Sequence, residues 1–147
     1  MSQVLAAKDA VLALFASTPA LAGIRRTWTW PAEEEDIGAE HMALGTVEQT
    51  EEWANLRRDA MSVEEEFTIS LGLWVFKPGD VLTAARSSEE RLWQLRDAFS
   101  TALRADIQLG GVVRTARLSR TRIEEPETVE EGYIAHAVLE ITCAQRI

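Results

Sequence analysis

Apolar and polar residues alternate most clearly in two stretches of the chain. Over residues 65–76, and again over residues 133–147, apolar side chains recur at every second position, which predicts two strands that each bury one face. Residues 24–30 and 112–124 are rich in β-branched or aromatic residues, and residues 40–49 alternate weakly. These three segments predict further strands, and residues 112–124 fit either one strand or a pair of strands, because their pattern is interrupted near Leu118.

Two other segments carry apolar residues at helical spacing. Residues 2–16 have them three and four positions apart, which predicts an amphipathic helix. Residues 87–106 repeat this spacing, and Ser87 with Glu90 matches the pattern of a capping box at the helix start. Residues 50–61 fit either a helix or a turn followed by a short strand.

The order of these elements predicts the fold class. It is packed most economically as an α+β fold, with a single antiparallel sheet of about four to five strands and two helices packed on one face. The length of 147 residues, without internal repeats or a Gly/Ser-rich linker, predicts a single domain over residues 1–147.

The charge of the chain narrows its possible partners. There are 24 acidic and 15 basic residues, a net charge of −9, and every basic residue except Lys8 and Lys77 is an arginine. Because this charge repels DNA phosphates, we do not expect a protein that reads DNA grooves unless its basic residues cluster strongly. The longest apolar run, residues 67–76, is about half as long as a membrane span, so we expect no membrane contact.

Motifs of catalysis are absent from the sequence. It has no nucleophile elbow, phosphate-binding loop or dinucleotide-binding glycine motif, and its two histidines, His41 and His136, lack metal-ligand spacing. Cys143 is the only cysteine and stands in an alternating strand, which favours a buried side chain over a nucleophile. We therefore expect no enzyme, no catalytic residues, no metal and no cofactor, and histidines that are exposed or partly buried.

Acidic residues gather in runs that the pattern assigns to loops. Two interpretations remain open: a solvated surface, or a negative surface that repels another polyanion or docks a basic partner. The shorter run at residues 64–66 is also expected to be solvated. The candidate acidic interface residues are Glu33, Glu34, Glu35, Asp36, Glu124, Glu125, Glu127, Glu130 and Glu131.

Arginines and tryptophans form a second set of candidates. The arginines of segment 112–124 either block edge-to-edge aggregation or pair with acidic loops of a neighbouring subunit. Trp28 and Trp30 precede a proline and share one strand face, so we expect them at the surface, whereas Trp74 and Trp93 are expected in the core. The candidate inter-subunit residues are Trp28, Trp30, Arg114, Arg117, Arg120 and Arg122.

The expected elements follow one another in a definite order: an N-terminal amphipathic helix, a first strand that leads into an acidic loop, the alternating segment Phe67-Thr68-Ile69-Ser70-Leu71-Gly72-Leu73, a central helix with Leu92-Trp93-Gln94-Leu95-Arg96, and two closing strands. In this order and in length, the chain resembles the tail terminator proteins (tail-completion or neck proteins) of long-tailed bacteriophages. The resemblance covers most of the chain and includes no diagnostic motif.

The resemblance implies a non-enzymatic structural subunit of the virion. Such proteins form a hexameric ring that caps the tail tube, stops its polymerisation and joins it to the head–neck connector protein, while genomic DNA passes through the lumen. The implied partners are further copies of the chain, the tail tube protein and the connector. The implied location is the tail or neck of the virion, which is assembled in the host cytoplasm.

Ring closure and DNA passage assign expected roles to the charged residues. A closed ring needs a heterologous interface, which an acidic loop and the arginine-bearing strand would supply. An acidic lumen would let DNA slide through without binding its phosphates. Residues 33–36 are the preferred lumen candidates, and residues 124–131 are the other.

Two alternatives come from other functional classes. One is an acidic binding module, similar to an immunity or inhibitor protein, that docks a basic protein partner. The other is a small enzyme or ligand-binding domain whose pocket the sequence does not reveal. A ring of six subunits distinguishes the terminator from both.

Overall fold

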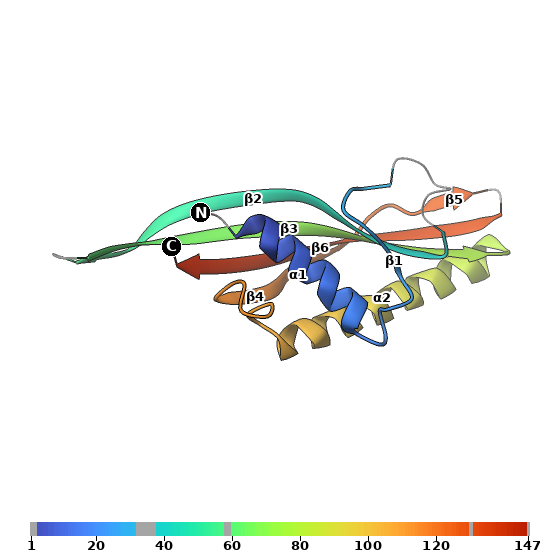
Figure 1. Ribbon diagram of the computed structural model, residues 1–147. Helices are drawn as coiled ribbons and strands as arrows, with labels where there is room; N and C mark the ends of the chain where they lie inside the picture. The colour runs from blue at the N-terminus through green and yellow to red at the C-terminus, as the bar shows by residue number, and fades with distance from the viewer. Residues whose placement is uncertain (1–2, 32–37, 58–59, 130, 147) are drawn as a thin grey trace.

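The computed structural model describes residues 3–31, 38–57, 60–129 and 131–146, and for residues 50–57, 60–64 and 146 it describes the backbone alone. Two helices and a six-stranded sheet make up this part of the chain (Figure 1). The elements run in the order α1 (Val4–Ser17), β1 (Arg25–Thr27), β2 (Glu40–Arg57), β3 (Ala60–Pro78), α2 (Val81–Ala105), β4 (Thr115–Ile123), β5 (Glu127–Val129) and β6 (Gly132–Arg146).

The sheet confirms the α+β class but is larger than predicted and not purely antiparallel. Its strand order is β1-β2-β3-β6-β4, and β5 pairs with the start of β6. β1 pairs with β2 in parallel, with Arg25 opposite His41 and Thr27 opposite Ala43. The prediction of an all-antiparallel sheet of about four to five strands was therefore wrong in this respect, because it did not anticipate the parallel pairing of β1 or the short β5 inside the acidic loop.

One face of the sheet is covered by both helices. The odd-numbered residues of β3 and β6 face them, as their alternation predicted, and share one buried cluster with Val11 of α1 and Leu95 of α2. The rings of Phe15 and Phe99 stack at 4.8 Å between centroids, which joins the two helices. The β3 members of the cluster are Phe67, Ile69, Leu71, Leu73 and Val75.

Helix α2 begins nearly two turns before the predicted start. Asp80 is its N-cap residue, and Gly79, with φ of +112°, makes the sharp turn from β3 into the helix. Ser87 therefore lies inside the helix, and the predicted capping box at its start was wrong. The early turns escaped prediction because Val81 and Leu82 are 42% and 82% exposed, which breaks the amphipathic pattern.

The hairpin of β2 and β3 extends beyond the rest of the sheet. Residues 50–57, which the sequence left open between helix and strand, belong to β2. β3 pairs with β6 no further than Glu64↔Arg146, whereas β2 and β3 continue to pair up to Arg57↔Ala60. The far end of the hairpin is thus a two-stranded ribbon that projects at one end of the molecule (Figure 1).

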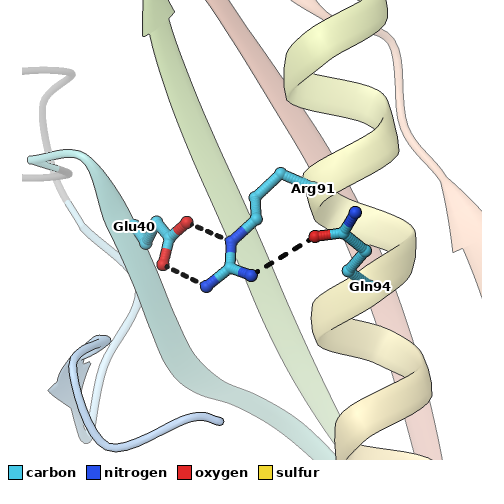
Figure 2. A network of polar contacts seen from close by, with 3 residues as sticks. All are labelled: Glu40, Arg91 and Gln94. Carbon is cyan, nitrogen blue, oxygen red and sulfur yellow. Dashed lines mark hydrogen bonds and ion pairs between the residues drawn. The ribbon is translucent and has the colours of Figure 1, made fainter.

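Arg91 of α2 holds the helix to the first residue of β2. Its Nε and Nη2 donate to the two carboxylate oxygens of Glu40 at 2.6 and 3.2 Å, and Nη1 donates to Gln94 Oε1 at 3.4 Å (Figure 2). These hydrogen bonds with Glu40 raise the pKa of the Arg91 guanidinium. The bidentate geometry fixes the direction of the helix over the strand.

Candidate interaction surface

The face of the sheet opposite the helices, here called the open face, carries a row of arginines. A register shift between Leu118 and Arg120 places Arg117, Arg120 and Arg122 on this face, because each lies opposite an even-numbered residue of β6. All three arginines are exposed on an edge strand, as predicted. Arg114 is also exposed but lies before β4 begins, so it is not part of the row.

Hydroxyl groups connect neighbouring strands across the open face. Thr68 and Thr142 approach at 3.3 Å, and Thr142 Oγ1 donates to Ser119 Oγ at 2.8 Å. Closer to β1, Thr46 Oγ1 donates to Ser70 Oγ at 3.3 Å. This polar lining is typical of a sheet face in contact with water or with a polar partner.

Four aromatic rings cluster on the same face. Trp74 is only 5% exposed, as predicted for a core residue, and His136 stacks on it at 4.4 Å with 11° between the planes. Trp30 meets Trp74 edge-on at 5.0 Å, and His41 meets it at 5.7 Å. The cluster joins the segment after β1 to strands β2, β3 and β6.

Trp30 packs against the open face because two glycines leave room for its ring. A Cβ on Gly45 would lie 3.0 Å from Cε3 and Cη2 of Trp30, and one on Gly72 would lie 2.9 Å from Cη2. Trp30 and Trp28 remain 38% and 37% exposed, which confirms the prediction that both reach the surface. Trp93 is 41% exposed on α2, so its predicted core position was wrong: Leu92 beside it takes the buried position.

The two histidines occupy different environments. His41 is 1% exposed, more buried than expected, and its Nε2 lies 2.7 Å from Thr27 Oγ1. Burial lowers the pKa of His136, although Glu124 opposes this shift and Arg122 adds to it. Nε2 of His136 is buried and has no hydrogen-bond partner among the described residues.

A groove on the open face, here called the Trp groove, has a volume of about 550 Å³. It lies where the chain leaves β1 and crosses the sheet, and it reaches from β2 toward β4. Tryptophan side chains, strand backbone and two cationic side chains line it together: Lys8, Trp28, Trp30, Gly45, Ser70 and Arg122. The sequence indicated the two tryptophans and Arg122 as interface candidates, but it gave no sign that Lys8 of α1 lies beside them.

The acidic candidates are distributed unevenly. Residues 33–36 (Glu33, Glu34, Glu35 and Asp36) and Glu130 lie outside the described residues. Glu124 accepts a hydrogen bond from Nε of Arg122 at 2.6 Å, so these two candidates pair within one chain. The remaining candidates are exposed: Glu125, Glu127 and Glu131.

Glu65 and Cys143 are both buried. Glu65 was expected to be solvated, but it is 1% exposed because it continues the inward-facing positions of β3, and Gln49 Nε2 donates to its carboxylate at 3.0 Å. Cys143 is fully buried, as predicted, and burial raises the pKa of its thiol to about 12. A thiol in this state is a packing group at neutral pH.

Comparison with family models and with curated proteins identifies no relative whose function could be compared with this surface. No protein-family model matches the chain, and no curated protein matches it either. No group of three or more His, Cys, Asp or Glu side chains within the described ranges is arranged to hold a metal ion. None of the described helices is both long and apolar enough to cross a membrane.

Proposed function

We propose that this protein is a structural ring subunit of the tail terminator type, which caps a phage tail tube and joins it to the head–neck connector. The hairpin of β2 and β3 is the observation that supports the proposal. Its ribbon beyond Glu64↔Arg146 pairs with no third strand of the described chain.

A neighbouring subunit supplies the third strand or packed surface that the ribbon lacks. Two-stranded ribbons are at best marginally stable in water, and they become stable when a third strand or a packed surface joins them. The sequence of the ribbon includes four apolar residues: Trp53, Leu56, Met61 and Val63. Assembly therefore stabilises the part of the fold that the isolated subunit supports least.

The placement of the ribbon favours a ring over a symmetric dimer. The ribbon and β5 lie at opposite ends of the molecule, so a contact between the ribbon of one copy and the β5 end of the next joins two different surfaces (Figure 1). Such a heterologous contact closes into a ring when the rotation per subunit is a whole fraction of a turn. Exposed carboxylates such as Glu131 repel DNA phosphates, which suits a ring that DNA passes through.

The test compares the full-length chain with a variant that has a short hairpin. In the variant, residues 52–64 are replaced by Asn-Gly, so that Glu51 and Glu65 flank a two-residue turn and keep their register. Native mass spectrometry of the full-length chain should give the mass of six subunits, and negative-stain images should show rings. The variant should be a folded monomer, because the helix-covered core lies outside the deleted ribbon.

Three outcomes contradict the proposal or part of it. A strict monomer, at high concentration and with tail tubes present, would overturn it. A monomer that binds a basic protein one to one would favour the acidic binding module instead. Rings that persist in the short-hairpin variant would show that the ribbon is not the contact that the proposal takes it to be.

A further inference from the structure

The Trp groove lies beside a strand edge that pairs with no strand of the described residues. β1 covers the outer edge of β2 only from His41 to Ala43. Beyond Ala43, no described strand pairs with this edge, and the register with β3 skips Gly45 and Thr46, which both line the groove. An extended chain that enters the groove therefore meets an open strand edge, to which it can add backbone hydrogen bonds.

The charge of the groove selects an acidic occupant. Nζ of Lys8 lies 4.5 Å from the centroid of the Trp28 ring, and the Arg122 side chain is 49% exposed although its Nε binds Glu124. The described residues that line the groove include no carboxylate. In a chain with a net charge of −9, this is a local site of positive charge. Opposite charges steer encounter and fix register at such contacts.

The shape of the groove suits a peptide. Its volume of about 550 Å³ is within the range of protein pockets that bind small ligands. Trp28 and Trp30 are both more than one third exposed, and tryptophans offer a large contact area at a low cost in side-chain entropy. An extended peptide presents alternate side chains to such walls.

An acidic segment of the same chain has the matching properties. Glu125, Pro126 and Glu127 are exposed where the chain passes from β4 to β5. In an extended segment, residues two positions apart point the same way, so the carboxylates of Glu125 and Glu127 can face one surface together. Pro126 has no N–H group, which keeps this stretch from being a central strand of its own sheet.

We infer that, in the proposed ring, the Trp groove of one copy receives residues 124–127 of the next copy, with Glu125 and Glu127 facing Lys8 and Arg122. The inference rests on the proposed function, since it names the surfaces through which neighbouring subunits meet. A groove and an exposed segment are different surfaces, so a head-to-tail arrangement of copies can repeat this contact around a ring. It adds to the contact through the ribbon.

Two charge-reversed variants test this pairing. The groove variant carries Lys8→Glu with Arg122→Glu, and the segment variant carries Glu125→Lys with Glu127→Lys. Each variant alone brings like charges together at every contact, so each should lose the ring mass and remain a folded monomer. Circular dichroism and urea unfolding should stay close to wild type, because all four side chains lie outside the helix-covered core.

Mixing the two variants restores complementary charge. In a ring that alternates between them, each groove variant meets a lysine-bearing segment, and each segment variant offers an unchanged groove to unchanged carboxylates. An equimolar mixture should therefore recover the six-subunit mass, with three copies of each variant, and should lose it again at high salt. Neither variant should recover it alone.

Matched reversals on α2 provide the control. Arg86 and Glu89 are exposed on the helix that covers the other face of the sheet, so Arg86→Glu and Glu89→Lys should leave the ring intact. Rings that persist in both variants, or a mixture that fails to reassemble, would overturn the inference while leaving the ring itself in place. A wild-type chain that never forms a ring would instead overturn the proposed function, and the groove assignment with it.

Discussion

Replacing Gly45 with alanine tests whether the packing of Trp30 depends on the absence of a side chain beneath it. A Cβ at this position would lie 3.0 Å from Cε3 and Cη2 of Trp30, and closer still to Cζ3. Carbon atoms in good contact are about 3.5–4.0 Å apart. The indole must therefore move away from the sheet or force the strand to move.

The magnitude follows from the contacts that the indole loses. Trp30 is 38% exposed, so its ring has room to move outward, but this weakens its edge contacts with Trp74 at 5.0 Å and with His136 at 6.0 Å. An aromatic pair contributes about 0.5–1.5 kcal/mol beyond burial, and overpacking costs about 1–3 kcal/mol. We expect Gly45→Ala to lower the free energy of unfolding by about 1–3 kcal/mol.

Urea unfolding and the indole N–H resonances of the folded protein measure this effect. The matched control is Gly23→Ala, because a Cβ on Gly23 meets nothing within 4 Å. The control should unfold close to wild type with its Trp30 resonance in place, while Gly45→Ala should unfold at lower urea with that resonance shifted. If the two variants had equal stability and an unmoved Trp30 resonance, the reasoning about this contact would be refuted.

Three further predictions concern two buried side chains and one ion pair. Because burial raises the pKa of Cys143 to about 12, a thiol reagent at pH 8 should label it only after denaturation, and rapid labelling of the folded protein would contradict its burial. Burial lowers the pKa of His136 from its usual 6.5, so the unfolded state binds the proton more readily; stability should be full above pH 6.5 and should fall as the pH drops through the lowered pKa. His136→Gln should lack this dependence, and an unchanged pH profile would refute it. Arg91→Ala and Glu40→Ala should each destabilise the fold, with a coupling energy of about 0.5–1 kcal/mol in a double-mutant cycle, and a coupling near zero would show that the ion pair does not hold α2.

The parts of the fold that the sequence predicted are those with one side in the core. In β3 and β6, apolar and polar residues alternate because the odd-numbered residues contact the helices and the others do not. The sequence pattern therefore reveals which positions are buried. The start of α2 and the far part of β2 show no such pattern of buried positions. Val81 and Leu82 are apolar but exposed, and residues 50–57 pair within a ribbon beyond the core.

The candidate surface was predictable only in part, because long-range contacts create it. The sequence indicated that Trp28 and Trp30 reach the surface, but Gly45 and Gly72 gave no sign that they accommodate a tryptophan ring. The interruption of the pattern near Leu118 marked the place of the register shift, but not which side chains the shift would bring to one face. That shift, and not spacing alone, brings three arginines to one face.

Both edges of the sheet carry features that prevent indiscriminate strand pairing, and the same features favour one charge-matched partner. The register of β2 shifts between Leu44 and Val47, and that of β4 shifts before Arg120, so neither edge is a flat template for another strand. β4 also presents exposed arginines, which repel a second copy of itself. A sheet edge that repels a second copy of itself, but lies beside a positively charged groove, selects its partner by charge. An acidic segment is attracted to it, whereas a basic segment is repelled. We therefore expect assembly of this chain to weaken steeply with rising salt, and salt-independent assembly would show that charge does not select the partner.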